Sequence, residues 1–136
     1  MKIQKIKFKN KKDKYSIEIG KNILRMLPKK IKAICPQTKK IALIFDTGVP
    51  LNYKKTISNY LKKYELSIFS FSANERIKNL KSVDYFLNKL LSKNFNRTDL
   101  VIGIGGGITG DLTGFVSSIY KRGINFINIP THIIIY

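Results

Sequence analysis

The fold of this chain is decided by the stretch Asp99-Leu-Val-Ile-Gly-Ile-Gly-Gly-Gly-Ile-Thr-Gly-Asp111-Leu-Thr-Gly-Phe115. The apolar run at residues 100–104 predicts a strand, and helical spacing resumes from about Gly110. Between the two stands Gly105-Gly-Gly107, a turn with no side chains. Such a turn lets backbone N–H groups approach a phosphate, with the positive end of the helix dipole behind them. The stretch therefore predicts a phosphate-binding turn for a nucleotide cofactor.

Apolar strands alternate with helical segments from residue 40 onward. This alternation predicts βαβ units, and hence an α/β, Rossmann-like fold with a parallel sheet and flanking helices. The predicted strands are residues 41–45, 66–71, 100–104 and 126–129, and the predicted helices are residues 51–63, 80–94 and about 110–121. At 136 residues the chain is expected to be a single nucleotide-binding domain over residues 1–136.

The first forty residues follow a different pattern. Residues 2–8 and 15–19 alternate polar and apolar side chains, which predicts an N-terminal β-hairpin at the edge of a sheet. Pro28 then requires a break or restart in a helical segment. The apolar face predicted for that segment consists of Ile23, Leu24, Leu27, Ile31 and Ile34. Cys35 is the only cysteine, so an intramolecular disulfide is excluded, and we expect it to pack near the helix end.

Polar residues follow the ends of three separate predicted strands. Asp46 follows the first, a loop with Glu75 and Lys78 follows the second, and the glycine turn follows the third. In parallel sheets ligands bind at the carboxyl ends of the strands. We therefore expect these three features to converge on one edge of the sheet.

The net charge of +18 suggests a polyanion as a partner. The cations are 22 lysines and 4 arginines spread along the chain, and isoleucine is as frequent as lysine at 22. This bias resembles that of an AT-rich genome, and arginine, which recognises phosphates and bases bidentately, is scarce. We expect a solvated lysine surface with weak, salt-sensitive polyanion binding and no specific nucleic acid partner.

The composition excludes several other classes of protein. The most apolar stretch, residues 124–136, is too short for a membrane span and contains Asn125, Asn128 and Pro130. The N-terminus lacks the continuous apolar core of a signal peptide, so we expect a cytoplasmic protein without membrane contact. His132 is the sole histidine, and without cysteines or nearby acids it cannot form a metal site.

The glycine turn matches the dinucleotide-binding fingerprint only in part. Gly105, Gly107 and Gly110 fit G-x-G-x-x-G between a strand and a helix. The fingerprint also needs an acidic residue about twenty positions downstream for the ribose, and no Asp or Glu follows Asp111. Asp46, at an upstream strand end, is the candidate for that carboxylate. The ordinary Rossmann interpretation is therefore disfavoured.

The residues on either side of the glycine turn give a more specific match. The segments Gly105-Gly-Gly-Ile-Thr-Gly-Asp-Leu-Thr-Gly-Phe115, Tyr120-Lys-Arg-Gly-Ile124 and Ile127-Asn-Ile-Pro-Thr131 closely resemble the 3-dehydroquinate synthase family. The resemblance implies a lyase of the shikimate pathway, which serves aromatic amino acid biosynthesis. It would convert 3-deoxy-D-arabino-heptulosonate 7-phosphate to 3-dehydroquinate and phosphate. The implied cofactors are NAD and a divalent metal, zinc or cobalt, and the implied assembly is a homodimer.

The same resemblance assigns roles to single residues. It implies contacts with the nucleoside side of NAD by Asp46, Glu75 and Lys78. It implies contacts with the pyrophosphate and the nicotinamide side by the glycine turn, including Gly105, Gly106 and Gly107, and by Asp111 and Thr131. Asp111 alone would also suit the first turn of a helix, where the dipole favours acids. Arg122 resembles the arginine that meets the substrate phosphate in a neighbouring subunit's active site.

The chain also departs from the family pattern. Asn74 precedes Glu75 where the family often has glycine, and Gly48 stands where a polar contact is common. His132 replaces the second threonine after Pro130. The family's C-terminal helical domain, with its Glu/His/His metal ligands, has no counterpart before Tyr136. The resemblance therefore covers only the N-terminal, NAD-binding part of the family.

Three functional hypotheses follow. The first is a 3-dehydroquinate synthase sequence cut short and inactive alone, because its chemical residues are missing. The second is a stand-alone nucleotide-binding domain that works with a separately encoded catalytic half. The third is a basic module that binds polyanions. The first hypothesis is favoured because it explains both the glycine motif and the apolar Ile133-Ile-Ile-Tyr136 end.

Overall fold

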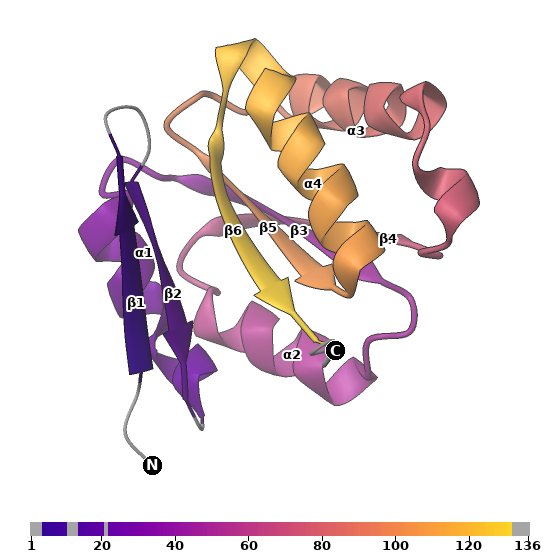
Figure 1. Cartoon of the computed structure of the whole chain (residues 1–136). Coiled ribbons are helices and arrows are strands. Elements are labelled where there is room, and N and C mark those ends of the chain that lie inside the picture. Colours follow the sequence, from indigo (N-terminus) through magenta and orange to yellow (C-terminus); the bar gives the residue numbers. More distant parts are fainter. Residues whose placement is uncertain (1–3, 11–13, 21, 132–136) are drawn as a thin grey trace.

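The computed structural model describes residues 4–10, 14–20 and 22–131, apart from the side chains of Phe8, Lys14 and Glu75 (Figure 1). The strands are β1 (Gln4–Lys9), β2 (Lys14–Ile19), β3 (Lys40–Asp46), β4 (Glu65–Phe71), β5 (Leu100–Gly105) and β6 (Asn125–Pro130). The helices are α1 (Leu27–Ile34), α2 (Leu51–Tyr60), α3 (Leu80–Ser92) and α4 (Gly107–Ile119), with the 3-10 helices η1 (Ile23–Met26), η2 (Glu75–Ile77) and η3 (Tyr120–Arg122). The expected alternation of strands and helices after residue 40 is confirmed.

Strands β3 to β6 form a parallel sheet of four strands in the order β4-β3-β5-β6. The centre of β3 pairs on both sides, since Leu43 lies opposite Ile68 of β4 and Ile102 of β5. Every residue of β5 is buried, as a strand covered on both faces requires. The predicted α/β class with a parallel sheet is confirmed.

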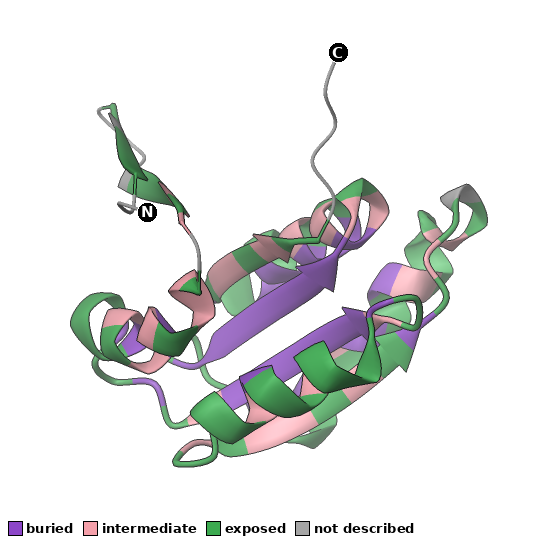
Figure 2. Ribbon diagram, turned by 90° about the horizontal axis from the view of Figure 1, so that it is seen from below, coloured by how far each residue is buried: buried purple, intermediate pink, exposed green. Residues whose placement is uncertain are grey.

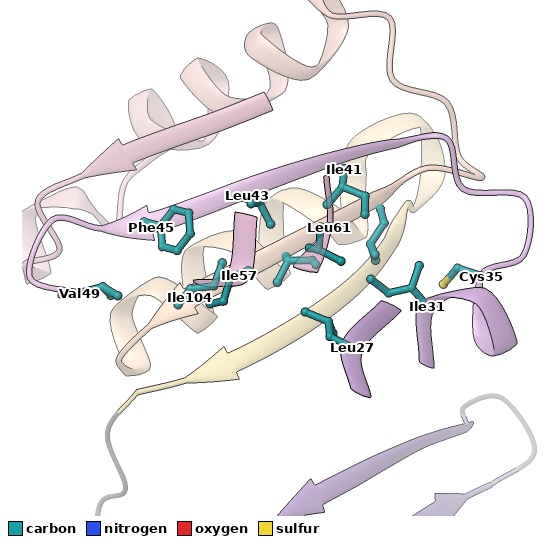
Figure 3. Close-up of a cluster of buried hydrophobic side chains, with 12 residues drawn as sticks. Leu27, Ile31, Cys35, Ile41, Leu43, Phe45, Val49, Ile57, Leu61 and Ile104 are labelled. Atoms are coloured by element: carbon teal, nitrogen blue, oxygen red, sulfur yellow. The ribbon is translucent and has the colours of Figure 1, made fainter. Parts of the chain in front are cut away.

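Helices cover both faces of this sheet (Figures 1 and 2). Alternate residues of β3 pack against the helices of opposite faces. Leu43 and Phe45 pack with Ile31 of α1 and Ile57 of α2 in one apolar cluster (Figure 3). Ala42 and Ile44 pack on the other side in a second cluster, whose helix residues include Val83, Phe86, Leu90, Leu112 and Val116 of α3 and α4. The sheet is therefore the middle of three layers, and its strand ends are free to carry polar residues.

Asp99 secures the start of β5 beside β3. It is 3% exposed, and its Oδ1 accepts hydrogen bonds from the backbone N–H groups of Lys39 at 3.1 Å and Lys40 at 2.9 Å. Its Oδ2 accepts from the backbone N–H of Asn96 at 2.8 Å. A buried carboxylate is stable only when it is hydrogen-bonded in this way. The acid that opens the glycine stretch therefore has a structural role at the amino edge of the sheet.

The N-terminal hairpin forms, but its expected position is wrong. Within the described residues β1 and β2 pair only with each other, as a separate antiparallel sheet. The Lys30 Nζ of α1 forms an ion pair with the Glu18 Oε1 of β2 at 2.5 Å, and this contact connects the hairpin to α1. Alternation along a strand predicts a half-exposed strand, but it does not specify which strand becomes its neighbour.

Helix boundaries were also predicted at a glycine and at a proline, and only the one at glycine is wrong. Helix α4 begins at Gly107, three residues before the expected Gly110, because the glycine turn itself supplies the start of the helix. Pro28 is the second residue of α1, directly after η1, so the predicted restart is confirmed. Ile34 is 64% exposed and does not belong to the buried face, whereas Cys35 is buried as expected.

The described helices are all too short or too polar to cross a lipid bilayer.

Candidate functional site

Asp46 lies where the carboxyl ends of β3 and β4 meet. Its Oδ1 accepts hydrogen bonds from the backbone N–H groups of Ala73 at 3.2 Å and Gly48 at 3.3 Å. The neighbouring Thr47 N–H donates to the carbonyl of Phe71 at 2.8 Å. These bonds fix the carboxylate at the sheet edge and join the loop after β4 to it.

The glycine turn lies beside Asp46. A Cβ on Gly105 would stand 3.1 Å from the Asp46 Cβ and 2.4 Å from the Thr109 Oγ1. A Cβ on Gly103 would stand 2.3 Å from the Thr113 Oγ1. Both glycines therefore have a packing reason of their own, which is the close approach of α4 to β5.

Gly107 differs from these two glycines. A Cβ on Gly107 would meet no atom within 4 Å, and the residue is exposed. Gly106 before it is the N-cap of α4 and has no side-chain cap, and the first turn contains no acidic residue. The first N–H groups of a helix have no intrahelical partner and attract anions. The arrangement suits a phosphate or another anion above Gly106 and Gly107.

Lys78 and Asp111 flank this helix start. The Lys78 ammonium lies 2.8 Å from the Asp111 Oδ2, and both residues line a pocket of about 340 Å³. The remaining lining residues are Asn79, Leu80, Val83, Leu112 and Phe115. Asp111 is the fifth residue of α4, so its placement in the first helical turn is wrong. It pairs instead with Lys78, which lies in the loop before α3.

Thr131 joins the same edge through its backbone. Its N–H donates to the carbonyl of Gly105 at 2.8 Å, directly after β6 ends at Pro130. Glu75 begins η2 in the loop after β4, and its side chain lies outside the described part of the structure. The expected convergence of strand ends on one edge is confirmed for Asp46, Lys78 and the glycine turn, and Thr131 lies at the same edge.

Arg122 is placed apart from these residues. It is an exposed residue of η3, which follows α4 and precedes β6, so it lies at the amino edge of the sheet. Helix α4 spans 13 residues, or about 20 Å at 1.5 Å per residue, between the glycine turn and this end. Within one chain, Arg122 and the glycine turn therefore belong to different sites.

Sequence reasoning did not single out Thr109. Its side chain is fully buried, and its Oγ1 has no hydrogen-bond partner among the described residues. Thr109 and Thr113 are four apart on α4 and face Gly105 and Gly103, which are two apart on β5. That matched spacing of threonines and glycines is the signal by which the contact could have been found.

The described residues offer no metal site, since no three His, Cys, Asp or Glu side chains among them come close enough to share an ion. The uncapped start of α4 is chemically suited to the diphosphate of a nucleotide. A divalent metal would need ligands from residues other than those described.

Comparison with known proteins agrees with these features. The family described as 3-dehydroquinate synthase N-terminal matches residues 68–135. The 3-dehydroquinate synthase of Pelagibacter ubique is 45% identical over 127 residues, which cover 93% of this chain and 34% of that enzyme. The enzyme of the same name from Clostridium kluyveri is 36% identical over 126 residues, which cover 91% of this chain and 35% of that enzyme.

Solved structures share the fold. A crystal structure of 2-deoxy-scyllo-inosose synthase has a TM-score of 0.83 at 23% identity, over 94% of this chain and 36% of that chain. An NADH-dependent butanol dehydrogenase from Thermotoga maritima has a TM-score of 0.67 at 15% identity, over 82% of this chain and 31% of that chain. The chain spans about a third of the length of the curated relatives it matches. By its sequence and its glycine turn, the chain belongs to the 3-dehydroquinate synthase family and corresponds to the N-terminal part of its members.

Proposed function

We propose that this chain is the NAD-binding part of a 3-dehydroquinate synthase. The observation that carries the proposal is the helix start at Gly106 and Gly107, which is uncapped, open at Gly107 and adjacent to Asp46. The diphosphate of NAD would accept hydrogen bonds from the first N–H groups of α4. Two proteins of the same fold have solved structures with such groups bound: a 2-deoxy-scyllo-inosose synthase with carbaglucose-6-phosphate, NAD+ and Co2+, and a 2-epi-5-epi-valiolone synthase with NAD+ and Zn2+.

The remaining residues of the carboxyl edge would orient the dinucleotide. We assign Asp46, Glu75 and Lys78 to its nucleoside side. The pyrophosphate and nicotinamide side is assigned to Gly105, Gly106, Gly107, Asp111 and Thr131. The support is the ion pair of Lys78 with Asp111, two residues that line one pocket, and the hydrogen bond from the Thr131 N–H to the Gly105 carbonyl.

The proposed reaction of the whole enzyme is the lyase step that forms 3-dehydroquinate and phosphate from 3-deoxy-D-arabino-heptulosonate 7-phosphate. When bound, NAD would supply the transient oxidation of a ring hydroxyl to a ketone and the later reduction of that ketone. In this chain the residues described above would hold the cofactor and fix its orientation. A divalent metal, zinc or cobalt, would be held by residues of the remaining two thirds of the family's length, because no ligand set is found among the described residues.

The proposal extends to how the protein works in the cell. We place it in the cytoplasm, as a biosynthetic enzyme of the shikimate pathway. Residues 1–136 are taken to form one domain, and homodimers are taken as the working assembly. In such a dimer the exposed Arg122 would reach the substrate phosphate bound by the other subunit. Because no group of three His, Cys, Asp or Glu residues in the described part of the chain could hold the metal, we expect the chain to be inactive alone.

The proposal is tested by assaying the purified chain with the heptulosonate phosphate, NAD and zinc, and by titrating it with NAD in a calorimeter. We expect no 3-dehydroquinate and weak, saturable NAD binding. The full-length enzyme of Pelagibacter ubique, assayed in parallel, shows that the reagents support turnover. Turnover by this chain would refute its expected inactivity, and an absence of NAD binding would refute its role as the cofactor-binding part.

A further inference from the structure

The charges of this chain are distributed unequally between the two helical layers. Residues 22–64, which supply α1, β3 and α2, contain ten lysines and arginines and one acid, Asp46 at the carboxyl edge of the sheet. Residues 80–123, which supply α3, β5 and α4, contain six lysines and arginines and three acids. A general bias toward lysine raises the lysine content of both layers, but it does not remove the acids from one of them. The layer of α1 and α2 is therefore basic beyond the average of the chain.

Most cations of this layer have no acidic partner among the described residues. Helices α1 and α2 contain no Asp or Glu. Lys30 is paired with Glu18, and the Lys54 ammonium lies 5.8 Å from the centre of the Phe45 ring. The other cations of the two helices, of η1 before α1 and of the turn after α2 are exposed and form no ion pair in the described part of the chain: Arg25, Lys29, Lys32, Lys55, Lys62 and Lys63. We call these six residues the basic face.

Two exposed tyrosines accompany the basic face on α2. Tyr53 is 49% and Tyr60 is 37% exposed. They are seven residues apart, which is about two helical turns, so both rings project from the same side of α2 about 10.5 Å apart along its axis. Each is followed two positions later by a lysine of the basic face, Lys55 or Lys62. The layer therefore presents aromatic rings together with unpaired positive charges.

We propose that the basic face binds single-stranded nucleic acid without sequence preference, with its cations against the phosphates and with Tyr53 and Tyr60 stacking on bases. Basic surfaces with exposed aromatic side chains bind single strands in this way. Lysine suits this role because it neutralises a phosphate as a point charge, whereas bidentate reading of bases is typical of arginine. This function goes beyond cofactor binding, since α1 and α2 cover one face of the sheet and the glycine turn begins α4 on the other (Figure 1).

An anionic membrane fits the basic face less well. A helix at a lipid surface buries its apolar face at the boundary between headgroups and acyl chains. In this layer the apolar faces of the helices are already used, because Leu27 and Ile31 of α1 and Ile57 of α2 pack on the sheet (Figure 3). The exposed Ile34 and Leu51 are single residues at the end of α1 and at the start of α2, and such isolated apolar residues are ordinary on a surface.

The experiment is fluorescence anisotropy of a labelled oligothymidylate of about twelve nucleotides, titrated with the whole chain between about 50 and 200 mM salt. The test variant combines Lys32→Gln on α1 with Lys55→Gln on α2. Its matched control combines Lys81→Gln with Lys93→Gln, two exposed lysines at the two ends of α3 in the opposite layer. Both variants lose the same charge, and circular dichroism and urea unfolding show that each is folded.

We expect the unaltered chain to bind the oligothymidylate with an affinity that falls steeply with salt. The test variant should bind at least about fivefold more weakly, and its slope of log affinity against log salt should be smaller by about 1.4, because two phosphate contacts are lost. The control should stay within about twofold of the unaltered chain with the same slope. Equal weakening in both variants would show that net charge alone attracts the strand and would overturn the basic face as its site.

Base stacking is tested with a second probe, an abasic oligomer of the same length. Tyr53→Ala should weaken binding of the oligothymidylate at least about fivefold and leave binding of the abasic oligomer unchanged. Tyr85→Ala is the matched control, since Tyr85 is 53% exposed on α3 and should not affect either probe. Equal affinity of the unaltered chain for the two probes would overturn the role of the tyrosines.

A membrane partner is tested with vesicles that contain phosphatidylserine. Vesicle binding that resists competition by the oligothymidylate would assign the basic face to a lipid surface and overturn the proposal. An unaltered chain that binds no oligothymidylate at about 50 mM salt would overturn it as well. Neither result affects the proposed binding of NAD, which is measured separately by calorimetry.

Discussion

The Lys78 ammonium lies 2.8 Å from the Asp111 carboxylate, which joins the loop before α3 to the second turn of α4. The side chains are 34% and 67% exposed. A pair this exposed contributes about 0.2–1 kcal/mol to stability, because water and salt screen it. Both residues line the same pocket, so the pair is placed where its loss can alter binding as well as stability.

Neutralising this pair should affect cofactor binding more than stability. For Lys78→Met and for Asp111→Asn we expect the free energy of unfolding in urea to change by less than about 1 kcal/mol. We expect NAD affinity to fall in both variants. Lys81→Met, on the exposed side of α3, is the control for loss of a lysine. A loss of several kcal/mol in stability with NAD affinity intact would contradict the assignment.

Alanine scanning of the glycines should separate packing from binding. Gly103→Ala places a methyl group 2.3 Å from the buried Thr113 Oγ1, so we expect a loss of about 1–3 kcal/mol from overpacking. Gly107→Ala meets no atom and replaces a poor helix former, so stability should be unchanged or raised by up to about 1 kcal/mol. Urea unfolding of the two variants measures the contrast. Equal losses at both positions would contradict the packing account.

Replacing the two buried threonines of α4 by valine should change the stability of the chain in opposite directions. The Thr109 Oγ1 has no partner among the described residues, so Thr109→Val should stabilise the chain by up to about 1 kcal/mol by removing a buried unsatisfied hydroxyl. The Thr113 Oγ1 donates to the carbonyl of Thr109 at 2.7 Å, so Thr113→Val should cost about 1 kcal/mol. Thermal unfolding of both variants tests the difference. A loss at both positions would show that the Thr109 hydroxyl is satisfied in solution.

Tyr120 should make the chain sensitive to alkali. Burial, with a smaller effect from the nearby Asp99 charge, raises the pKa of the Tyr120 phenol above its usual value of 10.0. The folded state therefore holds this proton more tightly than the unfolded state. Its contribution to stability is complete below about pH 10 and is lost as pH rises through the folded pKa.

Tyr120→Phe lacks this proton and should lose stability less steeply above pH 10, although it is less stable at neutral pH because the bond to the Phe95 carbonyl is gone. Urea unfolding at several pH values measures both effects. Parallel pH profiles for the two proteins would contradict the tyrosine assignment.

The sheet and its polar edge could be predicted because the patterns that indicate them lie within short segments of the sequence. Continuous apolar runs identify buried parallel strands, and the carboxyl ends of such strands share one edge, which places Asp46 beside the glycine turn. The start of α4 was missed because glycine is a poor helix former, whereas here Gly107 opens the helix. The position of the hairpin was missed because alternation does not specify a neighbouring strand.

The packing role of Gly103 and Gly105 depends on the distance between α4 and β5, which no single segment of the sequence contains. The edge of the sheet at which Arg122 lies could not be predicted for a similar reason. A residue eleven positions after Asp111 cannot be assigned to an edge until the length of the helix between them is known. The packing contacts of Gly103 and Gly105 were therefore missed, and the edge of the sheet at which Arg122 lies could be assigned only from the structure.

The most direct test of the account is calorimetric titration of NAD into the chain and two variants at Gly107. Glutamate at the first position of α4 favours the helix dipole but places a negative charge where the diphosphate would lie. We predict that Gly107→Ala binds NAD within about twofold of the unaltered chain, and that Gly107→Glu binds at least about tenfold more weakly without a lower melting temperature. Equal NAD binding by all three proteins would contradict the claim that the start of α4 holds the cofactor.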